Sequence, residues 1–213
     1  MKFYHTFKRI CEFFISGIAL IILFPLFFIV FFLVKFTSKG PAIYKHTRVG
    51  IKGKKFKIWK FRTMLINARE LQSEGFSNDE VSTKVGKILR KTFIDELLQL
   101  VNVFKGDMSL VGPRPLDEEL HEKHMKIDKR WIQVLKIRPG ITSLESVLDY
   151  LPEDEKKPFE EKFGNLAKTD KYKDYLHHRL VVDKYYIKHE SLFFDLSMIY
   201  YTIILMLRKI LNI

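Results

Sequence analysis

Two adjacent carboxylates and one arginine are the residues of this chain best suited to chemistry on phosphate. Asp95 and Glu96 stand side by side, and Arg114 follows them between two prolines, Pro113 and Pro115. A carboxylate pair can hold a divalent cation or attack phosphorus, and a rigidly presented arginine can bind phosphate oxygens. Because Pro113 fixes its own φ and Pro115 favours an extended Arg114, binding an anion costs this arginine less entropy. The segment therefore predicts a phosphate-handling site.

A helix from Phe93 to Lys105 is expected to present the acid pair, with Thr92 as its N-cap and Gly106 as its C-terminal stop. Asp95 then falls at the capping-box position, and Glu96 gains from the positive helix terminus. Helix capping alone explains both acids. Basic residues just before the pair, and the affinity of a helix N-terminus for phosphate, favour the chemical interpretation instead.

Composition limits the class of partner. The 213 residues are 47% hydrophobic and 29% charged, which is typical of a folded chain. A formal net charge of +12 indicates an anionic partner, namely nucleic acid, lipid headgroups or a phosphorylated substrate. The single cysteine, Cys11, excludes an intramolecular disulfide and gives no sign of an oxidising compartment.

An apolar segment near the N-terminus is long enough to cross a bilayer. Residues 13–34 contain no charged side chain. Pro25 lies near the middle and removes a backbone donor, so it breaks or kinks a helix there. Composition alone favours a kinked transmembrane helix. Basic residues flank both ends, however, and basic flanks prefer the cytoplasm, which suits a re-entrant helix–break–helix that returns through the same face.

The C-terminal segment predicts an amphipathic helix. Its apolar residues recur at spacings of three and four, while Asp195, Thr202 and Lys209 share another face. Periodicity alone fits a core-packing helix equally well. Beside an N-terminal membrane segment, a helix lying in the membrane interface is the better interpretation.

Between these two segments the pattern is mainly helical with a small β-hairpin. Strands are expected at residues 42–46 and 55–59, joined by the glycine-containing segment 50–54. A helix is expected at residues 116–135, and a solvated, charged helical excursion at residues 152–173.

Five motifs in order give the chain a resemblance to a known family. They are Thr47-Arg48-Val49-Gly50, Lys60-Phe61-Arg62-Thr63-Met64, the run from Lys91 to Pro115, Arg138-Pro139-Gly140-Ile141-Thr142, and Asp183-Lys184-Tyr185-Tyr186-Ile187 followed by Asp195. In this order they closely resemble the monotopic phosphoglycosyl transferases, a family of bacterial sugar transferases. The resemblance covers nearly the whole chain. It departs at Phe24, where many relatives carry serine, and after Thr142, where this chain reads Ser143-Leu144-Glu145-Ser146.

The resemblance implies a two-step transfer of a sugar 1-phosphate from a UDP-sugar to undecaprenyl phosphate, with release of UMP. Asp95 would be the nucleophile and would carry the sugar phosphate covalently, and Glu96 would help Asp95 to hold Mg²⁺. Five basic residues are candidates for phosphate contacts: Arg114, Arg90, Arg62, Lys60 and Arg138. The family departure after Thr142 leaves the sugar open.

The same resemblance implies a division of the chain and a location. Residues 1–38 would form the membrane-inserted re-entrant helix broken at Pro25, residues 39–190 a compact catalytic domain, and residues 191–213 the interfacial helix. The catalytic domain would lie on the cytoplasmic face of a bacterial inner membrane. No nucleic-acid partner is expected, and a homodimer is compatible with the sequence although no residue argues for one.

The competing hypothesis is a membrane-tethered basic protein that binds nucleic acid or anionic lipid without catalysis. The charge of +12 motivates it. Against it, the basic residues are scattered and no recognised nucleic-acid-binding motif is present. His121-Glu122-Lys123-His124 is one residue short of the zinc-protease spacing and predicts no metal site.

Overall fold

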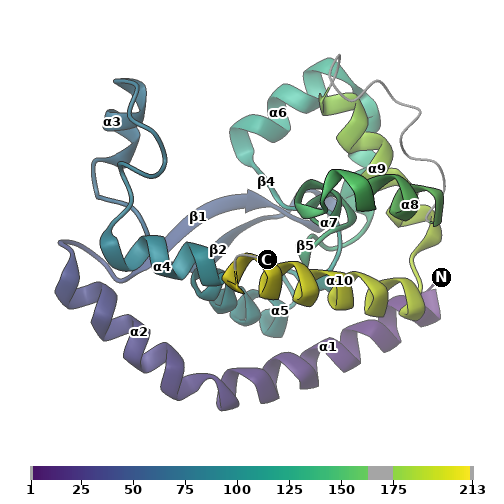
Figure 1. The fold of residues 1–213 in the computed structure, drawn as a ribbon. Coiled ribbons are helices and arrows are strands. Elements are labelled where there is room, and N and C mark those ends of the chain that lie inside the picture. The colour runs from purple at the N-terminus through teal and green to yellow at the C-terminus, as the bar shows by residue number, and fades with distance from the viewer. Residues whose placement is uncertain (1, 163–174, 212–213) are drawn as a thin grey trace.

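The computed structural model describes residues 2–162 and 175–211 and is mainly helical with small sheets (Figure 1). The helices are α1 (Lys2–Ile22), α2 (Phe24–Thr37), α3 (Ala68–Ser73), α4 (Lys84–Thr92), α5 (Leu100–Lys105), α6 (Glu118–Ile127), α7 (Leu144–Tyr150), α8 (Glu153–Lys162), α9 (Tyr175–His189) and α10 (Leu192–Leu211). The strands are β1 (Ile43–Val49), β2 (Lys55–Phe61), β3 (Ser109–Val111), β4 (Leu116–Asp117) and β5 (Gly140–Thr142). Three 3₁₀ turns complete the order: η1 (Ile51–Gly53), η2 (Ile94–Gln99) and η3 (Lys129–Lys136).

The N-terminal apolar segment forms two helices bent by 60° at a break beside Pro25. Leu23 caps α2, and Pro25 occupies the first turn, where a helix does not need the missing N–H. Among residues 2–162 and 175–211, no single helix is both long and apolar enough to cross a membrane, whereas this bent pair passes the same test when taken together. The predicted break is confirmed, and the re-entrant path stays a prediction.

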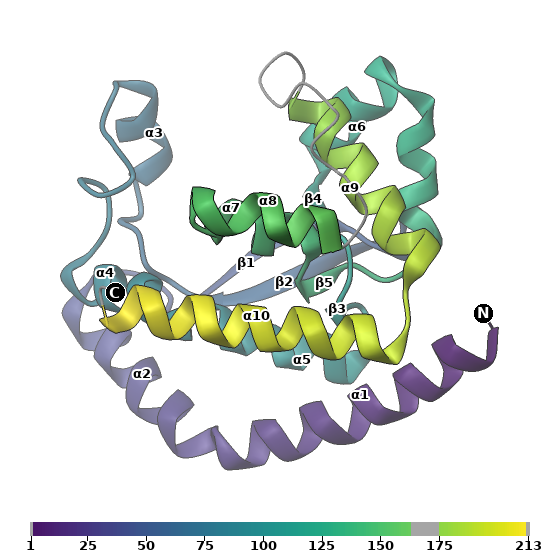
Figure 2. The ribbon, with the colours of Figure 1, turned by 45° about the vertical axis from the view of Figure 1, so that its right-hand side comes forward.

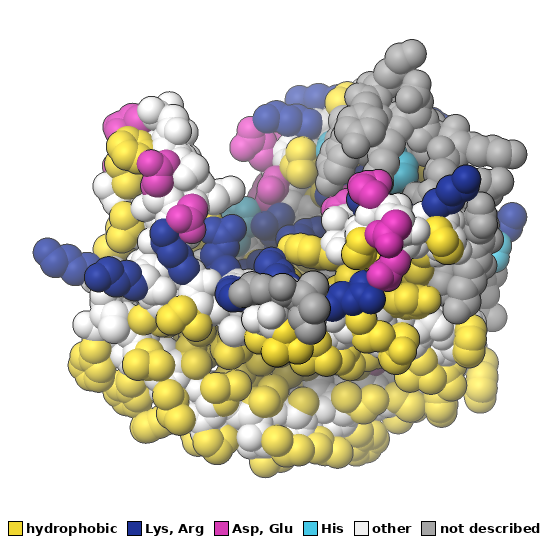
Figure 3. Space-filling view, in the orientation of Figure 1, with side chains coloured by type: hydrophobic (Ala, Val, Ile, Leu, Met, Phe, Trp, Pro, Cys, Tyr) yellow, Lys and Arg dark blue, Asp and Glu magenta, His cyan; other side chains and the backbone are white. Residues whose placement is uncertain are grey.

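The outward faces of α1, α2 and α10 form an apolar surface on one side of the molecule (Figure 3). Phe3 on α1, Phe36 on α2 and Phe193 on α10 are 86%, 79% and 73% exposed. Figure 2 shows α1 and α2 running beneath the domain, with α10 alongside. This much exposed apolar surface is unfavourable in water and suits contact with lipid.

Polar contacts fasten α1 to the domain above it. The buried Glu12 carboxylate accepts hydrogen bonds from the Ser109 hydroxyl and, at 2.8 Å, from the Leu110 amide. Lys8 pairs with the buried Asp195 of α10 at 2.7 Å. These contacts fix α1 directly below β3 and α10, so the apolar surface and the polar domain keep one orientation.

The predicted hairpin is confirmed, and its strands are longer than expected. β1 and β2 pair antiparallel from Ile43 opposite Phe61 to Val49 opposite Lys55, and β4 adds to the other edge of β1. The fully buried Asn102 of α5 holds β2 from behind, because its side chain bonds both the Trp59 amide and the Lys57 carbonyl.

A second, parallel pair of strands delivers the proline-flanked arginine. β3 and β5 align Ser109 with Gly140 and Val111 with Thr142. The two strands approach so closely that a Cβ on Gly112 would lie 2.5 Å from the Arg138 carbonyl oxygen. Glycine is therefore required for this approach. The chain leaves β3 directly into the segment that contains Arg114.

Two predicted helices are wrong in their bounds. The helix expected at 93–105 is divided: α4 ends at Thr92, Phe93 takes a left-handed conformation with φ 57°, and η2 and α5 follow. Thr92 is therefore not an N-cap; its hydroxyl instead donates back to the Ile88 carbonyl. The predicted stop at Gly106, with φ 87°, is confirmed.

The helix expected at 116–135 is also divided, into β4, α6 and η3. Asp128 ends α6 and caps η3, since its carboxylate accepts the Arg130 amide hydrogen at 2.8 Å. Such a local side-chain bond competes with a continuous helix. Of the charged excursion expected at 152–173, α8 ends at Lys162, and residues 163–173 lie outside the described residues.

The amphipathic C-terminal helix is confirmed as α10. Its polar face packs onto the domain: Thr202 shares a hydrogen bond of 2.6 Å with Thr142, and Asp195 accepts from the Tyr186 hydroxyl at 2.6 Å. Phe194, Met198 and Leu205 join the main apolar core beside them. The division of the chain into residues 1–38, 39–190 and 191–213 stays a prediction.

Candidate active site

The two adjacent carboxylates lie on η2, and Glu96 is held from both sides. Its Oε1 lies 2.6 Å from the Lys60 ammonium of β2, and its Oε2 accepts a hydrogen bond of 3.1 Å from Gln99. Side chains three residues apart are eclipsed on a 3₁₀ helix, which brings Gln99 directly over Glu96. Asp95 is buried, with 7% of its surface exposed.

The two acids differ in their electrostatic environment. Burial, followed by the neighbouring Glu96 charge, raises the pKa of Asp95 from 3.8 to about 6. Burial also acts to raise the pKa of Glu96, but the Lys60 ammonium and the Arg114 guanidinium outweigh it and hold that pKa below its ordinary value. Glu96 is therefore a fixed anion, and Asp95 is the more basic carboxylate of the pair.

Both acids line a cleft of about 1020 Å³. One wall comes from β1, β2 and the segment that follows β2, and another from α4 and η2. In the space-filling view, Lys and Arg side chains gather in the hollow above the apolar surface (Figure 3). The cleft is large enough for a nucleotide-sized ligand, and its basic lining favours an anion.

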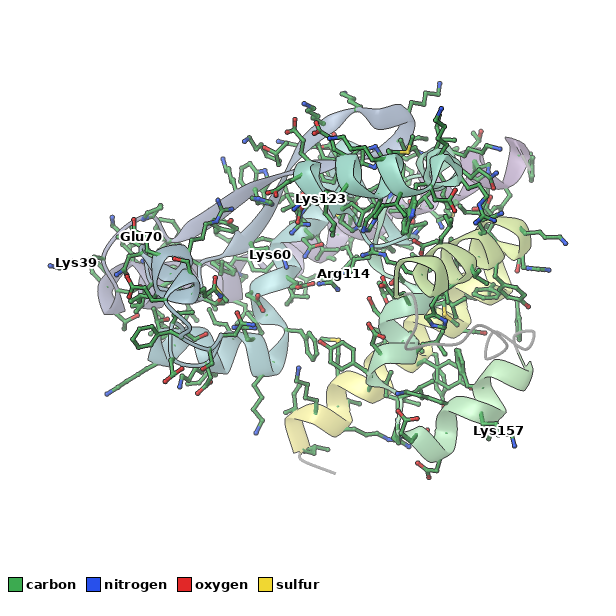
Figure 4. The ribbon with its side chains drawn as sticks, turned by 90° about the horizontal axis from the view of Figure 1, so that it is seen from above. Lys39, Lys60, Glu70, Arg114, Lys123 and Lys157 are labelled. Carbon is green, nitrogen blue, oxygen red and sulfur yellow. The ribbon has the colours of Figure 1, made fainter. Side chains whose placement is uncertain are left out.

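Arg114 reaches this cleft from the opposite side. Its flanking prolines are buried while Arg114 is exposed, and its backbone carbonyl accepts a hydrogen bond of 2.8 Å from Arg179 of α9. Seen from above, the Arg114 and Lys60 side chains lie close together beside the open centre (Figure 4). Within the described part of the chain, the Arg114 guanidinium forms no hydrogen bond or ion pair of its own. The backbone is fixed, and the charged group is available to a ligand.

A buried ionic cluster holds Arg179 in place. Its guanidinium lies 3.3 Å from Glu145 of α7 and 3.8 Å from Asp183 of α9. All three side chains are nearly inaccessible to solvent. Burial raises the pKa of Asp183 from 3.8 to about 8. This cluster, which includes Glu145, supports the loop that carries Arg114.

The other predicted phosphate ligands divide into two groups. Lys60 and Arg90 line the cleft with the acids, and Arg90 donates to the Ser82 hydroxyl at 3.1 Å. Arg62 also borders the cleft, but its guanidinium bonds the Ser38 carbonyl and hydroxyl and the Lys39 carbonyl, which fastens the end of α2.

Arg138 does not line the cleft. Its Nε donates to the Gly106 carbonyl at 2.9 Å, on the side of the domain that faces α1. The structure thus brings together Asp95, Glu96, Lys60, Arg90 and Arg114, and it gives Arg62 and Arg138 other partners.

The side chains of the cleft could hold Mg²⁺ only if a substrate and water supplied further ligands. In residues 2–162 and 175–211, no three metal-ligating side chains of His, Cys, Asp or Glu converge. Asp95 and Glu96 offer two carboxylates, one buried and one anchored. Mg²⁺ in phosphate-transfer sites commonly takes one or two carboxylates and completes its shell with substrate phosphates and water. The pair is compatible with that arrangement.

Several residues of the cleft were not predicted from the sequence. Gln99 was not predicted because its contact with Glu96, three residues away, depends on the 3₁₀ geometry of η2. Tyr150 of α7 and Lys209 of α10 also line the cleft, although they lie more than 50 residues from the acids in the chain. No local pattern indicates them, because tertiary packing alone brings them there.

Comparison with known proteins decides the family. The family model described as bacterial sugar transferase matches residues 3–209. This chain belongs to that family. The match covers both the bent N-terminal helices and the cleft.

Curated relatives in the family are named for sugar-phosphate transfer. UDP-glucose:undecaprenyl-phosphate glucose-1-phosphate transferase of Klebsiella pneumoniae is 35% identical over 93% of this chain and 39% of the relative. Undecaprenyl-phosphate galactose phosphotransferase of Salmonella typhimurium is 34% identical over 96% of this chain and 40% of the relative.

An N-acetylgalactosaminephosphotransferase of Aeromonas hydrophila that acts on undecaprenyl phosphate is 32% identical over 94% of this chain and 43% of the relative. The chain thus spans about two fifths of the length of these relatives. Their names share the acceptor and differ in the sugar.

Proposed function

We propose that this protein transfers a sugar 1-phosphate from a UDP-sugar to undecaprenyl phosphate, yielding undecaprenyl-diphosphate sugar and UMP. The observation that carries the proposal is the Asp95–Glu96 pair in one basic cleft, with Lys60 bound to Glu96 and Arg114 lining the same cleft. The names of the relatives support the reaction class. The transfer would begin the assembly of a bacterial surface glycan or glycoprotein.

In the first step an Asp95 carboxylate oxygen attacks the phosphorus that bears the sugar. The bond from that phosphorus to the bridging oxygen of the diphosphate breaks, and UMP leaves with the bond electrons on its phosphate. The product is a sugar phosphate joined to the Asp95 carboxylate as an acyl phosphate. A pKa raised to about 6 suits this role, because the carboxylate is ionised at neutral pH yet more basic than an exposed one.

In the second step a phosphate oxygen of undecaprenyl phosphate attacks the same phosphorus. The bond to Asp95 breaks, the carboxylate is regenerated, and the new diphosphate carries the sugar. No proton has to move in either step. Arg114, Lys60 and Arg90 stabilise the negative charge that gathers on the phosphate oxygens.

Asp95 and Glu96 would hold Mg²⁺ together with the diphosphate of the donor. Bound there, the ion would neutralise charge on the diphosphate and on the departing UMP. Lys60 and Gln99 orient Glu96 for this purpose, since each bonds one of its carboxylate oxygens.

The apolar surface of α1, α2 and α10 supports a location at a membrane, with α1 and α2 entering the bilayer and returning at the break beside Pro25. The catalytic domain would then lie on the cytoplasmic face of the bacterial inner membrane, where UDP-sugars are present. The exposed apolar side chains of these three helices gather on one side of the molecule (Figure 3). No nucleic acid is required by this function.

The test is release of UMP from a panel of UDP-sugars by membrane-reconstituted protein, with Mg²⁺ and undecaprenyl phosphate. One donor should release UMP with the wild type and none with Asp95→Asn. Release by a folded Asp95→Asn variant at the wild-type rate would overturn Asp95 as the nucleophile.

A further inference from the structure

A second, smaller hollow opens beside the carboxylate cleft. It has a volume of about 140 Å³ and is lined by Leu97 of η2, Ile141 and Thr142 of β5, Ser146 and Val147 of α7, and Thr202, Leu205 and Met206 of α10. Most of these side chains are apolar. Glu96 and Arg114 line both hollows, so the small one continues directly into the cleft.

An aromatic pair and one lysine mark the boundary between the two hollows. Phe93 and Tyr150 line both, and their rings meet edge to face with centroids 5.8 Å apart. The Lys209 ammonium lies 4.4 Å from the Phe93 centroid and 4.9 Å from the Tyr150 centroid. In the part of the chain that the structure describes, Lys209 forms no ion pair with a carboxylate.

The small hollow lies against the helix that carries the apolar surface. α10 turns Leu205 and Met206 inward to the hollow, and its exposed Ile203 and Leu207 belong to the apolar surface. The end of α10 therefore separates a lipid-facing side from a space that opens onto the carboxylates. Lys209 stands at this end, within the lining of the cleft.

We infer that the small hollow receives the first isoprene units of the lipid acceptor, while Lys209 pairs with its phosphate. This inference rests on the proposed function. The apolar lining matches a hydrocarbon chain, and the cation at the mouth matches its phosphate end. Such an acceptor would extend from the apolar surface past α10, and its phosphate would face Asp95 between Lys209 and Arg114.

Size and polarity distinguish the acceptor from the donor. A nucleotide sugar needs a polar site of several hundred cubic ångströms, which the cleft provides and the small hollow does not. The donor's sugar ring carries hydroxyls, whereas the hydroxyls in this lining already bond within the protein, Thr142 with Thr202 and Ser146 with Ser143. Burying the sugar among the remaining apolar side chains is unfavourable. A prenyl chain meets no such penalty.

The experiment separates the two half-reactions in membrane-reconstituted protein. The first is the burst of UMP released from the UDP-sugar without acceptor, and the second is steady turnover at varied undecaprenyl phosphate. Lys209→Gln should raise the KM for undecaprenyl phosphate about tenfold, the effect of one lost charge pair, and leave the UMP burst unchanged. Lys209→Arg should restore most of the affinity.

The matched control is Arg208→Gln, which removes a neighbouring cation that pairs with Glu155 at 2.7 Å and does not line either hollow. It should leave the KM for the acceptor unchanged. Met206→Trp, which fills the hollow, should raise that KM. If tryptophan prevents folding, the Lys209 variants and their Arg208 control carry the test alone.

Two outcomes would overturn the inference. One is an acceptor KM that is the same in Lys209→Gln, Arg208→Gln and wild type. The other is a UMP burst reduced as much as turnover, which would place the donor's sugar in the hollow. A wild-type protein with no UMP burst from any UDP-sugar would contradict the proposed function itself, which is a different result.

Discussion

Among the residues that the structure describes, the clusters around Lys60 and around Arg179 each combine one such cation with two carboxylates, and their surroundings are opposite. Lys60, Glu96 and Asp95 border a cleft of about 1020 Å³, whereas Arg179, Glu145 and Asp183 are enclosed in the core. Burial raises the pKa of one aspartate in each cluster, Asp95 to about 6 and Asp183 to about 8.

The difference shows that residue type does not identify a reactive site. At neutral pH, Asp183 is mostly protonated because burial raises its pKa to about 8. In the cleft, Asp95 and Glu96 are both ionised at neutral pH, and Lys60, Arg90 and Arg114 lie around them. The open cluster thus combines ionised carboxylates, a basic lining and space for a ligand. The enclosed cluster supports the loop of Arg114.

Replacing the cleft aspartate should have the largest effect on activity. Asp95→Asn keeps the shape of the side chain and removes the proposed nucleophile, so turnover should fall by about 10⁴-fold or more. The measurement is UMP release at saturating donor. Circular dichroism of the variant checks that it is folded, and turnover within tenfold of wild type would refute the assignment.

The second largest effect on turnover should come from removing divalent metal, which the cluster in the cleft needs and the enclosed cluster does not. Chelation should reduce turnover by about 10³-fold, because no ion then neutralises the charge on the donor diphosphate and on the departing UMP. Added Mg²⁺ should restore activity. The thermal unfolding midpoint should be unaffected by the chelator, since the enclosed cluster needs no ion. Full turnover in metal-free buffer would argue against a shared Mg²⁺ site.

Removing the cation of the enclosed cluster should mainly reduce the stability of the fold, with a smaller effect on donor binding. Arg179→Met leaves Glu145 and Asp183 buried without their cation, which should lower the free energy of unfolding by about 3–5 kcal/mol. Arg179→Lys keeps the charge and should cost less stability. Both variants lose the Nη2 donor to the Arg114 carbonyl, so both should raise the KM for UDP-sugar. Denaturant unfolding and donor kinetics provide the two measurements.

Neutralising the enclosed aspartate should stabilise the protein and leave its turnover largely unchanged. The folded pKa of Asp183, about 8, lies above its unfolded value of 3.8. Its contribution to stability is therefore fully present below pH 3.8 and is lost as pH rises through about 8. Asp183→Asn should raise the free energy of unfolding at pH 8 by about 1–3 kcal/mol, with turnover within about threefold of wild type. A variant less stable than wild type at that pH would contradict this account.

The pH dependence of activity should report on Asp95 alone. Because its raised pKa is about 6, kcat/KM should fall about tenfold per pH unit below that value and level off above it. A profile recorded with Asp183→Asn should show the same acidic limb. If the acidic limb shifted in Asp183→Asn, Asp95 would not be the carboxylate whose ionisation controls activity.

The sequence predicted the parts of the site that local motifs specify. Asp95, Glu96 and the proline-flanked Arg114 are recognisable from residue type and spacing, and the structure places them on one cleft. The hairpin and the break beside Pro25 followed from glycine and proline chemistry. The continuous helix at 93–105 was wrong because Phe93 takes a left-handed conformation, which a bulky aromatic rarely adopts and which only the tertiary packing of this loop explains.

The remaining site residues depend on contacts that no local pattern encodes. Arg62 and Arg138 have the charge of phosphate ligands, but their guanidinium groups donate hydrogen bonds to backbone carbonyls that are distant in the chain. Lys209 carries the same charge on a helix end and reaches the cleft because α10 packs across α4 and α7. From the sequence alone, a basic residue that is available to a ligand cannot be distinguished from one that bonds the protein's own backbone.

The most direct test of the account is the mass of the protein after incubation with its UDP-sugar in the absence of acceptor. The account predicts an adduct equal to one sugar phosphate, located on the peptide that contains Asp95, absent from Asp95→Asn and discharged by undecaprenyl phosphate. UMP release with no adduct under rapid quenching, or an adduct on another residue, would contradict the central claim.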